Sequence, residues 1–343
     1  MKIKTERKRR HLKRAAGQIT VLLLVCLLFS ACGTGPAKPE EDGKLKITVT
    51  VFPVYDWVRN IVGTENEDVE LTLLLQNGTD MHSFQPTVQD LLRISDSDLF
   101  VYIGGLSDAW VAGALKEVRN EKQQALELMA LLGDAVREEE FPEGMQEEHA
   151  HEEGDAHGHE EEDVHEADEH IWLSLRNAAL LTGKISQTLQ TLDPAHAAVY
   201  QKNTEAYLEK LASLDKAYED VVRAGKHDTL LFGDRFPFRY LTEDYGLNYY
   251  AAFAGCSAET EASFETVRFL AEKADELQLH TILTIEKSDG RIAETIAANT
   301  KTKDLEILTL DSLQGVTGQD VAAGTTYLSV MEKNLEVLKT ALE

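Results

Sequence analysis

Three short polar segments hold the side chains best suited to chemistry: GTDMHSFQP around His82, DEHIWL around His170 and TLDS around Asp311. Their neutral imidazoles and carboxylates are typical ligands of zinc and related divalent cations. The first and third segments follow apolar runs typical of strands, and the second stands where acidic sequence gives way to structured sequence. Since ligands of open α/β sheets lie beyond the carboxyl ends of strands, the three segments suit one shared site.

A second source of metal ligands is the stretch 138–169, which is almost wholly acidic and rich in histidine. Its histidines are His149, His151, His157, His159 and His165. Apolar residues are too few there to build a core, so the composition predicts a loop. Imidazoles bind zinc, copper and nickel, and flanking carboxylates raise the local cation concentration. We expect this loop to collect metal; an acidic linker with incidental histidines is the alternative.

Alternating strand and helix patterns must position these segments. The strand patterns cover residues 44–51, 71–75, 99–103, 229–232, 281–286 and 306–310. Helical spacing lies between them, as in TVQDLLRI, which begins with a capping pattern of Thr87 and Asp90. Strands that alternate with helices pair in parallel. The sequence therefore predicts an α/β fold with two parallel-sheet lobes, residues 44–192 and residues 226–343.

Residues 193–225 are predicted to form a single long helix between the lobes. Asp193 followed by proline is a helix start signal. Apolar side chains then recur every three or four residues from Leu211 to Val221, and Gly225 ends the pattern. A single long helix makes a stiff connection, so we do not expect large hinge motion between the lobes.

From about residue 45 to its end, the chain resembles the zinc- and manganese-binding lipoproteins of bacterial metal-uptake ABC transporters, the group with a rigid helix between its lobes. GTDMHSFQPT is similar to the first ligand motif of that family, DEHIWLSLRNA to the second and LDS to the last. DPAHAAVYQKNTEAYLEKLASLD is similar to its linking helix, and GCSAETEAS and TTYLSVMEKNLEVLKTAL to further segments. The resemblance implies a metal held in the cleft between the lobes, with no substrate chemistry and hence no enzyme.

By position, the resemblance implies His82 and His170 as metal ligands from the first lobe and Asp311 as a ligand from the second. Zinc accepts such a mixture of imidazole and carboxylate ligands in tetrahedral geometry. Each imidazole also needs a partner for its second nitrogen, and nearby carboxylates such as Asp168 and Glu169 are the expected ones.

The remaining ligand of the family is a His or Glu shortly before an aromatic-x-Tyr pair, here ending at Tyr240. Counting back gives Arg235, which has no lone pair to offer a cation. We therefore expect its neighbour Asp234 to be the ligand, with Glu286 or a water as alternatives. Cys256 is interpreted as a small buried side chain rather than a ligand, although a thiolate would suit zinc.

The N-terminus has the pattern of an export signal. Residues 1–31 combine a basic start, a short apolar run and small residues at the end. Leu28-Phe29-Ser30-Ala31-Cys32 resembles a bacterial lipobox, which implies cleavage before Cys32 and its lipidation. Residues 32–43 would then be a flexible tether that holds the protein outside the cell membrane.

The formal net charge of −26 makes nucleic acid an unsuitable partner and cations a natural one. Of the cysteines, Cys26 leaves with the signal and Cys32 would be lipidated, so Cys256 has no partner for an internal disulfide. Packed cores must stabilise the fold, and we expect a monomer.

These observations favour an extracytoplasmic, lipid-anchored zinc-binding component of an ABC importer that delivers zinc to a membrane permease. A manganese- or ferrous-iron-binding component is the first alternative, because carboxylate ligands favour harder ions whereas the histidine-rich loop favours zinc. An adhesin is a further alternative. A metal-dependent hydrolase is disfavoured, since the sequence has no H-E-x-x-H motif and no nucleophile elbow.

Overall fold

Two four-stranded parallel sheets frame the protein in a computed structural model, which describes residues 43–63, 66–145, 166–257 and 261–343. The first sheet has the order β2-β1-β3-β4 and the second the order β6-β5-β7-β8. The strands are β1 (Leu45–Val49), β2 (Val69–Leu73), β3 (Leu99–Tyr102), β4 (Gln124–Glu127), β5 (Thr229–Phe236), β6 (Asn248–Ala254), β7 (Thr281–Thr284) and β8 (Glu306–Thr309). The paired strands run parallel, so the predicted two-lobe α/β fold is confirmed.

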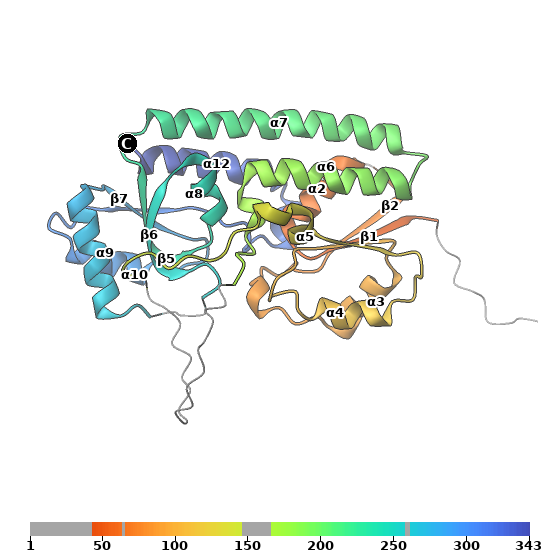
Figure 1. The fold of residues 1–343 in the computed structure, drawn as a ribbon, viewed down its shortest axis with the longest axis horizontal. Helices are drawn as coiled ribbons and strands as arrows, with labels where there is room; N and C mark the ends of the chain where they lie inside the picture. The colour runs from red at the N-terminus through yellow and green to blue at the C-terminus, as the bar shows by residue number, and fades with distance from the viewer. Residues whose placement is uncertain (1–42, 64–65, 146–165, 258–260) are drawn as a thin grey trace, which may run out of the picture. The chain divides into compact units, whose positions relative to one another are not determined.

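Helices cover both sheets (Figure 1). In the first lobe they are α2 (Phe52–Val62), α3 (Val88–Asp96), α4 (Val111–Ala114), α5 (Leu128–Leu132) and α6 (Leu175–Leu192). In the second lobe they are α8 (Arg239–Tyr245), α9 (Phe264–Leu277), α10 (Arg291–Asn299) and α11 (Gly318–Ala322). Two further helices are long: α7 (Ala197–Ala224) runs along both lobes, and α12 (Tyr327–Ala341) lies beside its second-lobe part (Figure 1). None of the helices in the described ranges is long and apolar enough to cross a membrane.

The predicted cap of α3 is present as a complete capping box. The Thr87 hydroxyl accepts a hydrogen bond from the Asp90 backbone N–H, and the Asp90 carboxylate accepts one from the Thr87 N–H.

Two strands were not predicted from the sequence, for different reasons. The short strand β4 lies at a sheet edge and is largely exposed, so it has no apolar run, and β6 reads NYYAAFA, without alternation.

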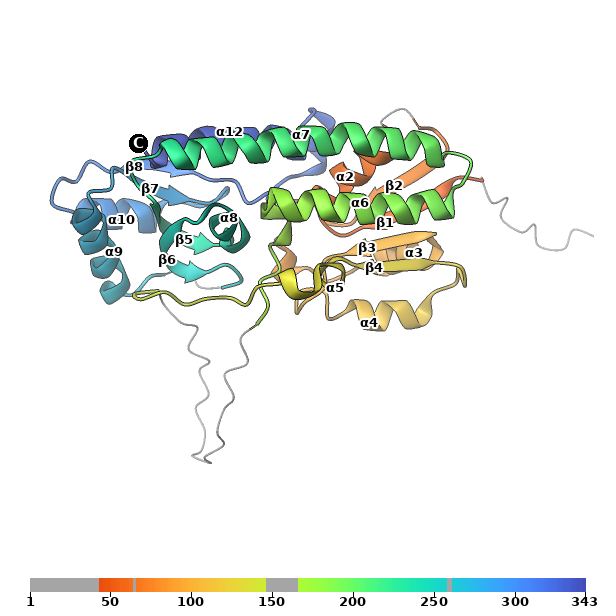
Figure 2. The same cartoon turned by 45° about the horizontal axis from the view of Figure 1, so that its top comes forward.

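The linking helix α7 ends at Ala224 as predicted, but its predicted start at Asp193 is wrong. Asp193 is instead the C-cap of α6, and its backbone N–H donates a hydrogen bond to the Leu189 carbonyl. Its carboxylate accepts hydrogen bonds from His196 Nδ1 and the Tyr200 hydroxyl, 2.7 Å away in each case. These bonds hold the turn between α6 and α7, which lie side by side (Figure 2).

The C-terminal helix α12 lies beside the second-lobe part of α7 (Figure 1). It begins against the first lobe, where the Tyr327 N–H donates to Asp56 and the Tyr327 hydroxyl donates to the Trp172 carbonyl. It ends beside the end of α7, where the Lys226 N–H donates to the Leu342 carbonyl. The two lobes are therefore joined by two helices that run in the same direction.

One hydrophobic core extends through both lobes. It contains first-lobe residues such as Trp57 and Trp172, the helix residue Tyr218, and second-lobe residues such as Phe232 and Phe238. A second, smaller cluster lies between the second sheet and the helices α9 and α10 (Figure 2). Because the main core crosses the lobe boundary, segments at that boundary are held by packing from both sides.

Candidate metal centre

His82 lies in η1 (Met81–Ser83), a single 3-10 turn in the segment between β2 and α3. The Asp80 carboxylate caps this turn by accepting a hydrogen bond from the His82 backbone N–H, 3.1 Å away. The neighbouring Met81 side chain is buried in the core and anchors the turn. The imidazole Nδ1 of His82 lies 2.8 Å from the Ser107 hydroxyl, and 16% of the side chain is exposed.

His170 lies directly before η4 (Ile171–Leu173) and is completely buried. One carboxylate oxygen of Asp168 accepts a hydrogen bond from the backbone N–H of His170 at 2.7 Å. The same oxygen lies 2.9 Å from Nδ1 of the His170 ring. The Asp168 carbonyl in turn accepts a hydrogen bond from the Tyr240 hydroxyl in the second lobe. Trp172 Nε1 donates to the Ser312 carbonyl, also in the second lobe. The ring of His170 is thus fixed by contacts to both lobes.

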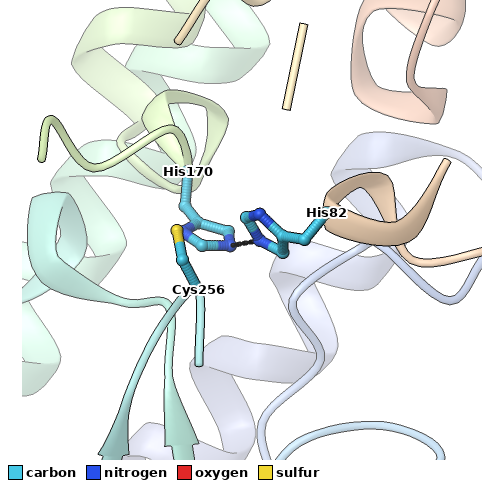
Figure 3. Close-up of side chains that lie close together, drawn as sticks. All are labelled: His82, His170 and Cys256. Atoms are coloured by element: carbon cyan, nitrogen blue, oxygen red, sulfur yellow. Dashed lines mark hydrogen bonds between the residues drawn. The ribbon is translucent and has the colours of Figure 1, made fainter. Parts of the chain in front are cut away.

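The two imidazoles face each other through their Nε2 atoms, which are 3.3 Å apart (Figure 3). With Nδ1 of His170 donating to Asp168 and Nδ1 of His82 donating to Ser107, both Nε2 lone pairs point into the same space. Two lone pairs at this distance repel unless a proton or a cation lies between them. Two nitrogens bound to one tetrahedral zinc at about 2.0–2.1 Å stand about 3.3–3.4 Å apart, which matches the observed separation.

The electrostatics of the pair favour one positive charge and oppose two. Burial lowers the pKa of His170, but the carboxylates of Asp168, Glu139 and Glu169 outweigh it and raise the pKa. Burial and the charge on His170 lower the pKa of His82 to about 4. At neutral pH the two imidazoles together therefore carry at most one positive charge, and a metal ion bound between the Nε2 atoms would take the place of the added proton.

The buried carboxylate of Glu169 also favours a positive charge beside the two histidines. One of its carboxylate oxygens accepts a hydrogen bond from the Ser107 N–H at 2.8 Å. The other, Oε2, is buried 3.5 Å from His82 Nδ1 and has no hydrogen bond within the described residues. Burial raises the pKa of Glu169. A buried carboxylate oxygen without a donor is costly unless a cation compensates its charge, so this environment favours a bound cation.

Cys256 is the third residue of the group. Its Sγ and one nitrogen each from His82 and His170 all lie within 4.8 Å of one another (Figure 3). The residue follows β6, so it stands at the carboxyl end of a parallel strand. From the sequence, Cys256 was interpreted as a small buried side chain rather than a ligand, and β6 was not predicted as a strand. Had it been, the position of the cysteine at a strand end would have indicated a ligand.

The two acidic residues considered for the missing ligand lie elsewhere in the second lobe. The Asp234 carboxylate accepts hydrogen bonds from the backbone N–H groups of Arg235 and Ile285. Glu286 accepts three, from the N–H and hydroxyl of Ser312 and the N–H of Gly315. Neither carboxylate belongs to the group formed by the two histidines and the cysteine. Both serve the loops at the ends of β5, β7 and β8.

Asp311 follows β8, as the sequence indicated, and also lies outside the histidine–cysteine group. Its carboxylate accepts a hydrogen bond from the Leu313 N–H at 2.8 Å. Burial and the neighbouring charge of Glu286 raise its pKa to about 6. Its predicted role as a ligand stays a prediction.

Arg235, at the position where the resemblance implied a ligand, forms an ion pair between the lobes. Its guanidinium lies 2.9 Å from the Asp80 carboxylate, whose other oxygen caps the turn that carries His82. Asp108, in the loop after β3, accepts hydrogen bonds from the N–H groups of Ile103 and Gly104. Arg235 therefore helps to position His82, whereas Asp108 stabilises its own loop.

Several predicted sites lie outside the described residues. They are the histidines of the acidic segment (His149, His151, His157, His159 and His165) and the lipidation site Cys32. The segment that carries these histidines leaves the described part of the chain at Met145 and re-enters it at Glu166. At its base, the Glu139 N–H donates to the Glu166 carbonyl and Glu138 pairs with Ala167.

Comparison with known proteins decides the family. The family model of ZnuA, described as zinc-uptake complex component A, periplasmic, matches residues 47–341. The chain belongs to the ZnuA family. This confirms the resemblance drawn from the ligand motifs, and the matched residues include His82, His170 and Cys256.

ZnuA relatives match most of the chain. The zinc-binding lipoprotein AdcA of Streptococcus pneumoniae strain R6 is 32% identical over 94% of this chain, but the match covers only 60% of AdcA. The high-affinity zinc uptake system protein ZnuA of Bacillus subtilis is 31% identical over 94% of this chain and 96% of its own length. The Zn(II)-bound ZnuA-like domain of S. pneumoniae AdcA superposes with a TM-score of 0.67 at 29% identity, over 88% of this chain and 99% of the domain.

Proposed function

We propose that this member of the ZnuA family is the extracytoplasmic zinc-binding component of an ABC importer, and that His82 and His170 are its metal ligands. The observation that carries the proposal is the pair of Nε2 atoms 3.3 Å apart, each ring held from its other nitrogen. Fixing the tautomer through Nδ1 leaves Nε2 free to bind a metal. The arrangement therefore needs little reorganisation to accept zinc.

The surroundings support a cation as cargo. Four carboxylates, those of Asp80, Glu139, Asp168 and Glu169, influence the charge of one or both histidines. His170 is fully buried and His82 largely so, which strengthens electrostatic interactions at the site. The relatives named as zinc-binding lipoprotein and as zinc uptake protein support zinc as the ion.

The first experiment is a competitive metal titration of residues 33–343 against a chromophoric chelator. We expect one tightly bound zinc ion, and we expect manganese in excess not to displace it, because imidazole nitrogens prefer zinc to manganese. Tighter binding of manganese or ferrous iron than of zinc would replace this proposal by a manganese- or iron-binding component of the same transporter type.

The acidic segment is proposed to gather zinc and pass it to the histidine pair. A variant in which a short Gly-Ser linker replaces residues 146–165 removes all five histidines but keeps the base of the segment, where Glu139 bonds to Glu166. We expect this variant to keep the tight site and to lose additional weak zinc sites. Isothermal titration of both proteins measures the two classes, and an unchanged total stoichiometry would contradict the collecting role.

Membrane attachment and delivery complete the proposal. Cys32 would carry the lipid that holds the protein on the outer face of the membrane, and the permease of the importer would receive zinc. Expression of a Cys32→Ala variant in a bacterial host with labelled palmitate tests the anchor. Loss of label together with release from the membrane is expected, and label retained at the parent level would contradict lipidation at this residue.

A further inference from the structure

We propose that Cys256 supplies a thiolate as the third zinc ligand, beside Nε2 of His82 and Nε2 of His170. The Cys256 sulfur and one ring nitrogen of each histidine lie within 4.8 Å of one another, and Figure 3 shows the sulfur beside the His170 ring. This inference rests on the proposed function, since it names a ligand of the same zinc ion. It changes the ligand set from the histidines and carboxylates implied by the motifs to one that includes sulfur.

The chain around Cys256 is built to bring it against His170. A side chain on Gly255 would place its Cβ 3.1 Å from His170 Cε1 and 2.9 Å from the Phe236 carbonyl oxygen. Only glycine therefore lets the backbone approach the imidazole this closely. The Cys256 N–H donates to the Glu139 carboxylate at 3.0 Å, which fixes the residue from the first-lobe side.

The neighbouring residues leave the third position to the cysteine. Arg235 extends from β5 toward the same region, but its guanidinium has no lone pair and is paired with Asp80. Asp234 is turned toward the backbone of Ile285. Of the second-lobe residues described, Cys256 is the one whose donor atom joins the two histidines.

Sulfur also fits the chemistry of the cargo. Zinc is bound by thiolate at about 2.3 Å and by imidazole at about 2.0–2.1 Å in one tetrahedral shell. On binding, the thiol S–H bond is broken, the proton is released to solvent, and a zinc–sulfur bond forms. Thiolate is a soft ligand that favours zinc over manganese. A cysteine in the shell would thus bias the protein toward zinc even where carboxylates are nearby.

Cobalt(II) substitution tests the inference directly, because a thiolate bound to cobalt gives a sulfur-to-metal charge-transfer band in the near ultraviolet. Residues 33–343 contain Cys256 as their only cysteine, so the band has one possible source. We expect the parent protein to show this band together with visible bands of tetrahedral cobalt. The Cys256→Ser variant, which keeps the size of the side chain, is expected to lose the ultraviolet band and keep the visible ones.

Affinity and reactivity give two further readouts. Losing a partner that only orients a metal ligand typically lowers metal affinity by about 10- to 100-fold. We expect Cys256→Ser, which removes a ligand itself, to lower zinc affinity by no less than this and to lower the preference for zinc over manganese. Zinc is also expected to protect the parent thiol from alkylation by iodoacetamide. Circular dichroism of the variant confirms that it is folded.

The outcomes separate this inference from the function on which it rests. Tight cobalt and zinc binding that depends on His170, without a charge-transfer band and with unchanged affinity in Cys256→Ser, would overturn the thiolate ligand and leave the zinc-binding function intact. A parent protein that binds neither metal tightly would refute the function itself, and the ligand role with it.

Discussion

Replacing His170 with alanine is expected to lower zinc affinity by more than about a hundredfold. The loss of an outer-shell partner already costs about 10- to 100-fold in metal affinity, and His170 is proposed as a ligand itself. Its ring is fully buried and fixed by Asp168, so no solvent-exposed side chain can swing in to replace it. The truncation also leaves Asp168 without its ring partner in a buried position.

Competitive titration with a chromophoric chelator measures this change. His280→Ala is the matched control, because His280 is an exposed histidine in the second lobe and lies outside the histidine–cysteine group. The control is expected to bind zinc as the parent does. Parent-like zinc affinity in His170→Ala would show that the metal binds elsewhere, and only the acidic segment would remain as a candidate.

Changing Asp168 is expected to weaken zinc binding without removing it, by about 10- to 100-fold, the usual effect of losing a partner that orients a metal-bound histidine. The carboxylate holds both the backbone N–H and Nδ1 of His170. Asp168→Asn keeps an oxygen that can accept these hydrogen bonds but removes the negative charge. Asp168→Ala removes both, so we expect the larger loss in the alanine variant.

The comparison of the two Asp168 variants separates orientation from charge. The same titration measures their affinities, and thermal unfolding without metal checks that each remains folded. Asp96→Asn is the control, since Asp96 is an exposed carboxylate of the first lobe. If both Asp168 variants bound zinc as tightly as the parent, the ring of His170 would not depend on this carboxylate for its orientation.

The two histidines were predicted from the sequence because their motifs resemble those of a known family, and each motif also forms its own support. Asp80 caps the turn of His82 from two residues away, and Asp168 holds His170 over the same short distance. Such contacts join near neighbours in the chain, so each motif brings its supporting carboxylate with it. The alternating strand and helix patterns likewise predicted both sheets, because parallel strands are joined by helices.

The rest of the site depends on contacts that no local pattern encodes. Cys256 meets His170 only through the pairing of β6 with β5 and the close approach at Gly255. Arg235 could be excluded as a ligand from its chemistry, but its ion pair with Asp80 joins residues far apart in the chain. The start of α7 was missed because the Asp193 carboxylate is used by His196 and Tyr200 instead of starting a helix.

The path of α12 has a consequence for any attempt to divide the molecule. Tyr327 is buried beside Trp57 and bonded to Asp56 and Trp172, so the last helix completes the packing of the first lobe. A stop codon ahead of α12 would therefore expose part of the core of the first lobe, although that lobe is encoded in the other half of the gene. Neither half can therefore be treated as an independent module, and damage to the C-terminus reaches the lobe that carries both histidines.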